Sequence, residues 1–374
     1  MSAPVRLAGD GDRFEPALLD AWRELAELRG NPFLTPEWFL ACREALDEGE
    51  PLLLVWEPEG RVRGVLPLVA TRSGGLRVLR FAGSAWGDWF TPACRPEDEA
   101  AMGASCASWL SENHARWHLL DLTRVAAESA WPAALWEAGE GIAAPRPRRD
   151  DVLPCIRVPE GGYEEYLASR SRNFRSQLGR RRRKLERDHG LSFRLTAERD
   201  ELDRDLDVFF ELHEERWRAR GGSSALRAES KALHRSFAAA ALERGWLRLW
   251  TADVDGEPGA SWYGWRIGER YCYSLSGLRA ELEPLALGTV LLAHTIEQAA
   301  AEGAAVYDLM RGDEAYKTRF ETDRREAQSW TIGRRRHPVA LAVAGRDRVA
   351  AGARRLPPFA RTPLKALYRI GSRR

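Results

Sequence analysis

Three residues that could take part in proton transfer lie close together near the end of the chain: Asp308, Tyr316 and Lys317. Asp308 lies in a short apolar segment that is predicted to be a strand, and Tyr316 and Lys317 follow after one tight loop. A carboxylate can orient a group or accept a proton, a tyrosine hydroxyl can donate a hydrogen bond, and a lysine ammonium can neutralise developing negative charge. In an open sheet all three would face the crevice beyond the strand's carboxyl end. A structural role, with Asp308 capping the loop and the Tyr316 ring packed, explains the pattern equally well.

A second group of candidates could bind a substrate. His213 and Trp217 lie on or near one turn of a helix predicted over residues 202–218, and Arg311 follows the Asp308 strand. We expect these three side chains to line an acceptor pocket. A tryptophan at helical spacing is also typical of a core, so packing alone is the alternative explanation for Trp217.

The elements that must position these residues follow one order twice. In the second part of the chain we predict strands over 246–254, 259–266 and 271–276, a helix over 285–301 and a strand over 305–310. In the first part we predict strands over 52–56, 62–70 and 76–82, a helix over 97–113 and a strand over 117–122, after a helix over 33–46. Each part therefore has the order β-β-β-α-β, and the string Asp121-Leu-Thr-Arg124 matches Asp308-Leu-Met-Arg311.

This repetition predicts an α/β (α+β) protein built from two related mixed-sheet halves with flanking helices. The first half spans residues 1–145, a proline-rich connector or irregular strand entry spans 146–160, and the second half spans 161–333. A basic tail spans 334–374, with twelve Lys or Arg residues against one acid, Asp347. The short apolar run of the tail is too short to cross a membrane, so the tail is expected to lie on anionic lipid or to be disordered.

Composition limits the class of protein. Lys plus Arg is 57 and Asp plus Glu is 55, so a globally basic nucleic-acid binder is not indicated. The five cysteines are widely spaced, without a zinc-like pattern, and there is no apolar stretch of the length that a membrane span needs. We therefore expect reduced thiols, no metal, and a cytoplasmic protein that could bind peripherally at the inner face of the membrane.

Several segments resemble acyltransferases of the GNAT superfamily, in the doubled branch that includes CelD-like proteins of cellulose and exopolysaccharide clusters and Fem-type aminoacyl ligases. The match covers residues 160–335 well and the first half more loosely. The segments that carry it are Leu285-Ala-Leu-Gly288-Thr-Val-Leu-Leu292, Tyr307-Asp308-Leu-Met-Arg-Gly312, Glu314-Ala-Tyr316-Lys317 with Phe320, Leu212-His213-Glu-Glu-Arg216-Trp217, and the basic segment 171–186.

The resemblance implies transfer of an acyl group, carried on coenzyme A or on a tRNA, to an amine. It implies that Leu287, Gly288 and Thr289, at the start of the 285–301 helix, bind the cofactor, since helix N-termini bind phosphate. The loop departs from the family's Arg/Gln-x-x-Gly-x-Gly/Ala pattern, because it has one glycine and no matching basic residue. Gly288 could also be a simple helix-entry glycine.

The expected function is N-acyl transfer, most simply N-acetyl transfer from acetyl-CoA or another acyl-CoA. The acceptor would be an amine of a small metabolite or a sugar precursor of cell-surface polysaccharide, and the first half would be a degenerate scaffold forming one wall of the cleft. The enzyme alternative is a Fem-like ligase that uses aminoacyl-tRNA. The other alternative is a non-catalytic membrane-associated assembly factor.

The basic segment 170–187 also has two explanations. It carries nine Lys or Arg residues and one acid, Glu186, which favours an anionic partner such as an anionic acceptor, a tRNA or a membrane surface. The alternative is a solvated charged helix whose cations pair with acids such as Glu198, Asp200 and Glu201.

Overall fold

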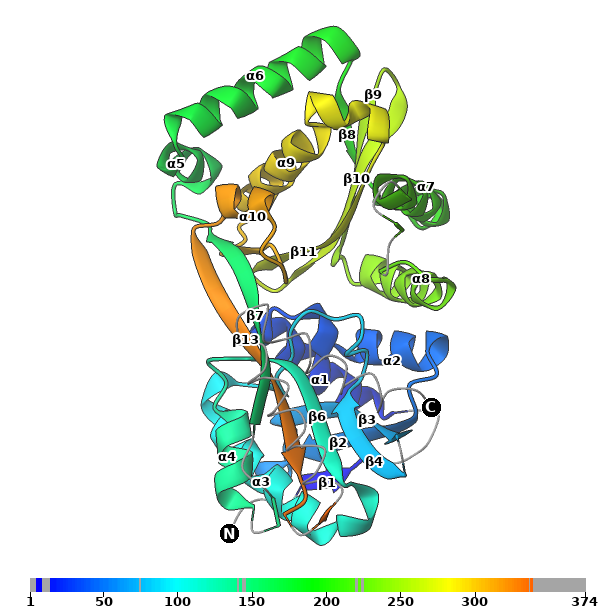
Figure 1. Ribbon diagram of the computed structural model, residues 1–374, viewed down its shortest axis with the longest axis vertical. Helices are drawn as coiled ribbons and strands as arrows, with labels where there is room; N and C mark the ends of the chain where they lie inside the picture. The colour runs from blue at the N-terminus through cyan, green and yellow to red at the C-terminus, as the bar shows by residue number, and fades with distance from the viewer. Residues whose placement is uncertain are drawn as a thin grey trace, which may run out of the picture.

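Both predicted repeats are present in the structure, a computed structural model (Figure 1). It describes residues 5–8, 14–73, 75–139, 141–142, 146–218, 221–222, 225–335 and 337–338, so almost all of the predicted basic tail lies outside the described residues. The first half contains β1 (Val5–Leu7), α1 (Pro16–Arg29), α2 (Pro36–Ala45), β2 (Glu50–Trp56), β3 (Gly64–Ser73), β4 (Leu76–Phe81), β5 (Ala93–Cys94), α3 (Glu99–Glu112), β6 (Leu119–Ala126) and α4 (Trp131–Ala138).

The second half begins after one long strand, β7 (Arg146–Arg157). It contains α5 (Gly162–Ser169), α6 (Arg172–His189), β8 (Ser192–Leu195), α7 (Arg199–Arg218), α8 (Ala228–Glu243), β9 (Leu247–Val254), β10 (Glu257–Ile267), β11 (Arg270–Leu278), α9 (Leu287–Ala301), β12 (Val306–Asp308), α10 (Ala315–Phe320) and β13 (Asp323–Gly333). The repeated order is therefore β2-β3-β4-α3-β6 and β9-β10-β11-α9-β12, as predicted. The segment 146–160, predicted as a connector or an irregular strand entry, forms β7 for most of its length.

The strands of both halves join in one mixed sheet. Its order is β1-β2-β3-β4-β6-β13-β7-β12-β11-β10-β9-β8, and β5 pairs with β3 beside this row. In each half the last strand of the repeat runs parallel to the third, since β6 pairs parallel with β4 and β12 pairs parallel with β11. The predicted α/β class with a mixed sheet is confirmed.

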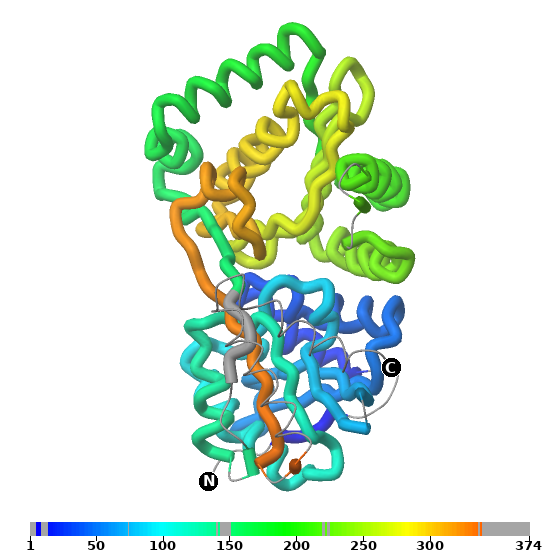
Figure 2. The backbone as a smooth tube through the Cα atoms, viewed as in Figure 1, coloured from blue at the N-terminus to red at the C-terminus, as the bar shows by residue number. Residues whose placement is uncertain are grey.

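The two halves exchange their final strands. β13 follows the second half in sequence but pairs antiparallel with β6 of the first half, and β7 follows the first half but pairs antiparallel with β12 of the second. The exchanged strands also pair with each other over Asp323–Thr331 of β13, and they run side by side from one half to the other (Figures 1 and 2). Neither half therefore completes its sheet from a continuous segment of chain.

The apolar core also crosses the boundary between the halves. Trp38 of α2 packs edge to face on Phe237 of α8, and Phe33 packs edge to face on Trp265 of β10. A separate cluster under α5, α6 and α9 covers the other part of the second half's sheet. Burial of these large rings supplies most of the attraction between the halves, since apolar area removed from water is the dominant favourable term in folding.

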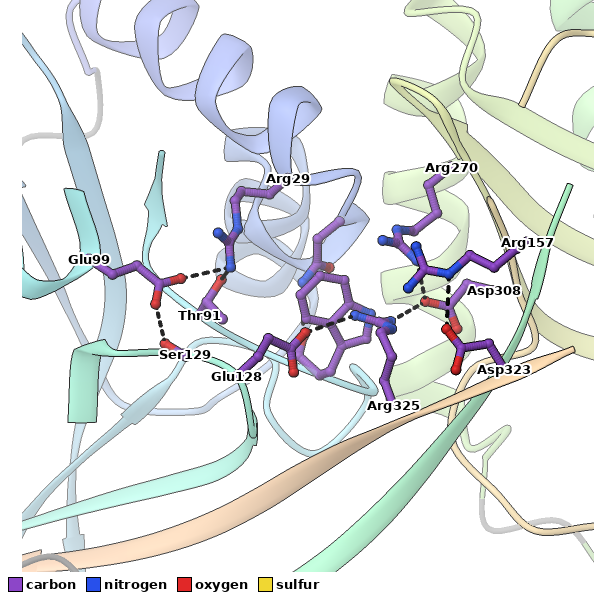
Figure 3. A network of polar contacts seen from close by, with 12 residues as sticks. Arg29, Thr91, Glu99, Glu128, Ser129, Arg157, Arg270, Asp308, Asp323 and Arg325 are labelled. Atoms are coloured by element: carbon purple, nitrogen blue, oxygen red, sulfur yellow. Dashed lines mark hydrogen bonds and ion pairs between the residues drawn. The ribbon is translucent and has the colours of Figure 1, made fainter. Parts of the chain in front are cut away.

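A buried carboxylate lies where the exchanged strand meets the second half (Figure 3). Asp308, at the end of β12, is fully buried and binds two guanidinium groups: Arg325 of β13, whose Nη2 is 2.5 Å from Oδ2, and Arg270 of β11, at 3.2 Å. The Arg325 guanidinium also lies over the ring of Trp89 from the first half, 4.6 Å from its centroid. One ion-pair cluster thus joins β11, β12, β13 and the loop after β4.

Replacing Arg325 with Met is expected to destabilise the protein by about 3 kcal/mol, because it leaves a fully buried carboxylate with only one cationic partner, Arg270. The neighbouring Arg324 is the control, since its own side chain is exposed and its pair with Asp313 lies at the surface. Arg324→Met should cost less than about 1 kcal/mol. Urea unfolding of both variants measures the difference, and equal losses would contradict a structural role for the buried pair.

Candidate functional site

The structure contains a cleft of about 410 Å³ between the halves. One side is the first-half loop that carries Ala85, Trp86 and Asp88, and the other side comes from α7, α8, β11 and the segment that connects β12 to α10. Five residues predicted from the sequence meet there. They are His213, Trp217, Arg311, Tyr316 and Lys317.

The cleft opens where β11 and β12 separate. β12 pairs with β11 only through residues Arg270–Cys272, whereas β11 continues to Leu278 with β10 on its other side. The expected strand 305–310 ends early at Asp308, because an Asp308 oxygen accepts the N–H of Met310, at 2.9 Å, and Met310 takes a left-handed φ of 56°. The chain turns away at that point, and the carboxyl half of β11 lines the opening, as in other open sheets that bind ligands.

Hydroxyl groups form a hydrogen-bonded row along the cleft. The Tyr316 hydroxyl donates to that of Tyr273, at 3.4 Å, and the Tyr273 hydroxyl lies 2.7 Å from Oγ of Ser276. The Arg216 guanidinium donates to the same Ser276 oxygen. Burial raises the pKa of Tyr316 well above its usual range, so Tyr316 keeps its proton and can act as a hydrogen-bond donor at neutral pH.

Two neutral imidazoles also line the cleft. Nδ1 of His213 lies 2.9 Å from the Ser276 carbonyl, so it must carry the hydrogen of the neutral ring. His234 lies almost fully buried on α8, edge to face with Tyr263. Burial lowers the pKa of each histidine to about 4. Both rings are therefore uncharged near neutral pH, and a neutral imidazole can accept a proton.

Charged groups of both signs complete the cleft. The ammonium of Lys317 donates to the Arg311 carbonyl, at 2.7 Å, and pairs with Glu314, at 3.0 Å. The Arg311 guanidinium pairs with Asp88 of the first half, at 3.3 Å. Burial raises the pKa of Asp88, while the charge of Arg311 opposes this shift. The cleft thus combines carboxyl groups, three cations and hydroxyl donors within one opening.

The predicted cofactor residues do not line the cleft; they lie at the start of α9. Leu287, Gly288 and Thr289 begin this helix after Ala286, which has a left-handed φ of 56°. The first N–H groups of a helix have no partner within it, although here the Thr289 N–H binds the Ala286 carbonyl. A Cβ added at Gly288 would meet only Leu278, at 3.9 Å. A ligand group therefore has space at the helix start next to the carboxyl end of β11.

The structure separates Asp308 from the other predicted site residues. Asp308 does not line the cleft; it holds Arg270 and Arg325 and caps the loop through Met310, which is the structural alternative that the sequence left open. Sequence reasoning missed Asp88, Arg216 and Tyr273 as cleft residues. Arg216 lies within the resemblance segment Leu212–Trp217 and could have been found there. Asp88 carries no local signal, since it reaches the cleft only through the packing of the halves.

No group of three or more His, Cys, Asp or Glu side chains in the described part of the chain is arranged to hold a metal ion. The five cysteines are buried free thiols.

Comparison with known proteins supports the resemblance. Residues 172–318 match the family model described as an acetyltransferase (GNAT) domain, and no curated protein sequence matches. Among solved structures, FemX has a TM-score of 0.61 at 12% identity, covering 87% of this chain and 98% of its own. The L-PGS protein of Bacillus licheniformis has 0.54 at 13%, covering 91% and 98%, and a conserved protein of unknown function from Bacteroides thetaiotaomicron has 0.56 at 11%, covering 88% and 99%. At these identities the likeness concerns the fold.

The buried histidines predict an acid-sensitive stability. An unfolded histidine binds a proton near pH 6.5, but His234 in the folded protein does so only at about 4, so the unfolded state binds more protons between these values. The stability that comes from the neutral His234 is therefore fully present above pH 6.5 and is lost as the pH falls toward 4. By pH 5 the free energy of unfolding has fallen by about 2 kcal/mol because of His234.

Urea unfolding at pH 7 and pH 5 tests this expectation with His234→Phe, which keeps a ring beside Tyr263 but cannot titrate. The loss of stability between the two pH values should be smaller in the variant by about 2 kcal/mol. The difference in unfolding free energy between the wild type and the variant at pH 7 gives the packing cost of the substitution. An unchanged difference would show that His234 does not contribute to the acid sensitivity.

Proposed function

We propose that this chain, whose residues 172–318 form a domain of the GNAT acetyltransferase superfamily, transfers an acyl group to an amine bound in the cleft between its halves. The donor in this proposal is an acyl-CoA, most simply acetyl-CoA. The acceptor is an amine of a small metabolite or of a sugar precursor of cell-surface polysaccharide. The proposed division of the chain is a first half over residues 1–145, a connector over 146–160, a second half over 161–333 that carries the activity, and a tail over 334–374.

The observation that carries the proposal is that strand β11 leads from the start of α9 to the residues that line the cleft. The helix start at Gly288 adjoins Leu278, and β11 runs from Leu278 back to Tyr273, beyond the stretch that pairs with β12. A helix N-terminus favours a phosphate, and the strand edge provides backbone groups for an amide-containing arm. A carrier with a phosphate at one end and a reactive acyl group at the other fits this path.

The cleft contains groups suited to the steps of acyl transfer. An amine must lose a proton before or during its attack on the acyl carbon, and Asp88 and His213 are the cleft groups proposed to receive it. Negative charge then develops on the acyl oxygen and on the departing sulfur. In the proposed roles Lys317 and Arg311 stabilise that charge, and the protonated Tyr316 donates a hydrogen bond to the leaving group.

Asp308 is proposed as a positioning residue. Its oxygens hold Arg325 and Arg270 and accept the Met310 N–H, which fixes where the chain leaves β12. The segment after Met310 carries Arg311 and leads to Tyr316 and Lys317. A fixed exit from the strand therefore fixes the positions of the groups proposed to act on the acyl donor.

The first half is proposed to be more than a support. Arg124 donates hydrogen bonds to the carbonyls of Ser84 and Gly87, so it shapes the loop that carries Trp86 and Asp88. Trp86 and Trp217 approach the cleft from opposite halves and are proposed to contact the acceptor, together with His213. The degenerate repeat thus supplies an acceptor-binding wall.

A Fem-like ligase that uses aminoacyl-tRNA is the second candidate. Two observations favour it: the loop before α9 has one glycine and lacks the usual coenzyme A pattern, and the fold is similar to that of FemX. In this alternative the same cleft accepts an aminoacyl group, and the charge of the tRNA is bound away from the start of α9.

Among the described helices, none combines the length and apolar character required to span a membrane.

Binding of acetyl-CoA should raise the unfolding temperature of the protein by roughly 3 °C or more at saturating concentration, because the ligand binds only the folded state. Gly288→Phe should abolish the rise, since its ring fills the space at the α9 start, whereas Gly288→Ala should keep it. Release of free coenzyme A in the presence of a panel of amines and amino sugars then identifies an acceptor.

No thermal shift with acetyl-CoA or longer acyl-CoA would contradict the first candidate. A shift with charged tRNA and not with acyl-CoA would favour the second. A shift that survives Gly288→Phe would place the donor away from the start of α9.

Removing the Tyr316 hydroxyl should slow the chemical step. Tyr316→Phe keeps the ring in place, so kcat should fall about 10- to 100-fold with little change in the KM for either substrate. Tyr163→Phe is the control, because Tyr163 is a half-buried tyrosine of α5 that does not line the cleft. Steady-state rates of coenzyme A release measure both variants, and an unchanged kcat in Tyr316→Phe would remove this residue from the mechanism.

A further inference from the structure

Helix α6 has two faces of opposite character. Phe174, Leu178 and Leu185 are buried in the cluster under α5, α6 and α9, and Phe174 packs edge to face on Phe320 of α10. The helix lies along the outer edge of the second half, away from the first half (Figure 1). Its apolar face is therefore fully used in packing, and only its other face is available to a partner.

That other face carries a row of exposed cations, here termed the basic stripe. It consists of Arg172, Arg180, Arg183, Lys184 and Arg187. At about 100° per residue these five positions fall within roughly 120° of the helix circumference, opposite the buried seam, and at about 1.5 Å per residue they extend over roughly 22 Å. The other residues of this arc, Asn173 and Ser176, are uncharged and exposed.

The stripe is not neutralised by the protein. Arg182, on the flank of the helix, pairs with Glu186 and Glu297, and of the stripe residues Arg187 pairs with Asp188 at the surface. Within the described residues no ion pair involves Arg172, Arg180, Arg183 or Lys184. Glu201, an acid that the sequence offered as a partner, pairs with Arg204 on its own helix. The explanation of this segment as a self-paired charged helix is therefore not supported at the stripe.

The remainder of the chain has the opposite sign. The net charge is +2 for all 374 residues, +8 for residues 170–187 and +11 for residues 334–374, which leaves −17 for everything else. A strongly negative partner is thus attracted to α6 and repelled by most of the remaining surface. This separation of charge fixes the orientation in which such a partner can approach.

We propose that the basic stripe of α6 docks the protein on an anionic lipid surface. A flat surface contacts an exposed helix on the outer edge without a groove, and each basic side chain near it adds electrostatic attraction. The stripe has no aromatic side chain for stacking on bases, which proteins that bind single-stranded nucleic acid use. It also has no apolar side chain for insertion, so the contact is electrostatic and sensitive to salt.

Docking through α6 has a consequence for the cleft. The amino end of α6 adjoins α10, because Arg319 of α10 binds Gln177 and lies over the Phe174 ring. Helix α10 also carries Tyr316 and Lys317 of the cleft wall. Docking through α6 would therefore bring the lipid surface to the helix that packs on α10, which carries two residues of the cleft wall.

Sedimentation with vesicles tests the proposal on the full chain. Wild-type protein should bind vesicles that contain about a quarter phosphatidylglycerol and not pure phosphatidylcholine, and binding should be lost at about 0.5 M salt. The triple variant Arg180→Glu, Arg183→Glu, Arg187→Glu should lower the partition by roughly a hundredfold, since each basic residue contributes about a factor of five. Arg61→Glu, Arg72→Glu, Arg95→Glu is the matched control, because it reverses three exposed arginines of the first half.

The control should bind vesicles as the wild type does. A second variant with Gln at positions 180, 183 and 187 keeps the test valid if the charge-reversed protein unfolds. The proposal is overturned if wild-type protein does not bind the anionic vesicles, if the α6 variants bind as well as the control, or if a tRNA duplex competes all protein off the vesicles through the same residues. Loss of binding on deletion of residues after 334 alone, with the α6 variants unaffected, would assign docking to the tail instead.

Acyl transfer and docking can be distinguished. The stripe does not line the cleft, so the α6 variants should keep the thermal shift with acetyl-CoA. If the α6 variants lose vesicle binding but keep the thermal shift, docking through α6 is supported. If the wild-type protein shows no thermal shift with any acyl-CoA, the proposed acyl transfer fails, and the vesicle assay still decides on docking.

Discussion

The fully buried Asp308 carboxylate is the interaction on which the architecture depends. A charge at that depth is tolerated only when partners replace its water, and here Arg325 and Arg270 do so. Arg325 belongs to the exchanged strand β13, and the ring beneath it, Trp89, belongs to the first half. Displacement of β13 would remove Arg325 and leave the carboxylate with Arg270 and the Met310 N–H, and displacement of the first-half loop would remove the ring that packs on Arg325. The cluster therefore couples the exchange of strands to the exit of the chain from β12.

That coupling explains why the cleft is built from both halves. The loop that supplies Trp89 to the ion-pair cluster also supplies Asp88 to the cleft, one residue earlier. Met310, held by Asp308, precedes Arg311, which pairs with Asp88. Two adjacent contacts, one buried and one lining the cleft, thus align the halves. Both halves thus contribute residues to one cleft.

The repeated order of strands and helices was predictable because it rests on local signals, namely alternation of apolar residues and turns at glycine. The exchange of strands was not. Pro147 and Pro154 in β7 indicate a connector, since proline cannot donate to a ladder and is rare in central strands. In the structure β7 pairs with β12 only through residues 155–157, so both prolines lie where β13 is the paired strand, and on its other side Pro154 needs only its carbonyl, which accepts the Leu309 N–H. Asp88 was missed for the same reason: long-range packing decides its position, and the sequence near it gives no signal.

The single glycine before α9 is weaker evidence against coenzyme A than the motif suggests. An anion at a helix start needs free N–H groups and open space, and glycines matter only because they permit both. Here Ala286 takes the left-handed conformation itself, at a cost of roughly 1–2 kcal/mol, and Gly288 leaves the space open. Ala286 therefore says more about this turn than the number of glycines does. A residue other than glycine keeps such a strained conformation only where the surrounding structure requires it. The start of α9 thus combines a left-handed residue with open space at Gly288, although the sequence lacks the usual pattern.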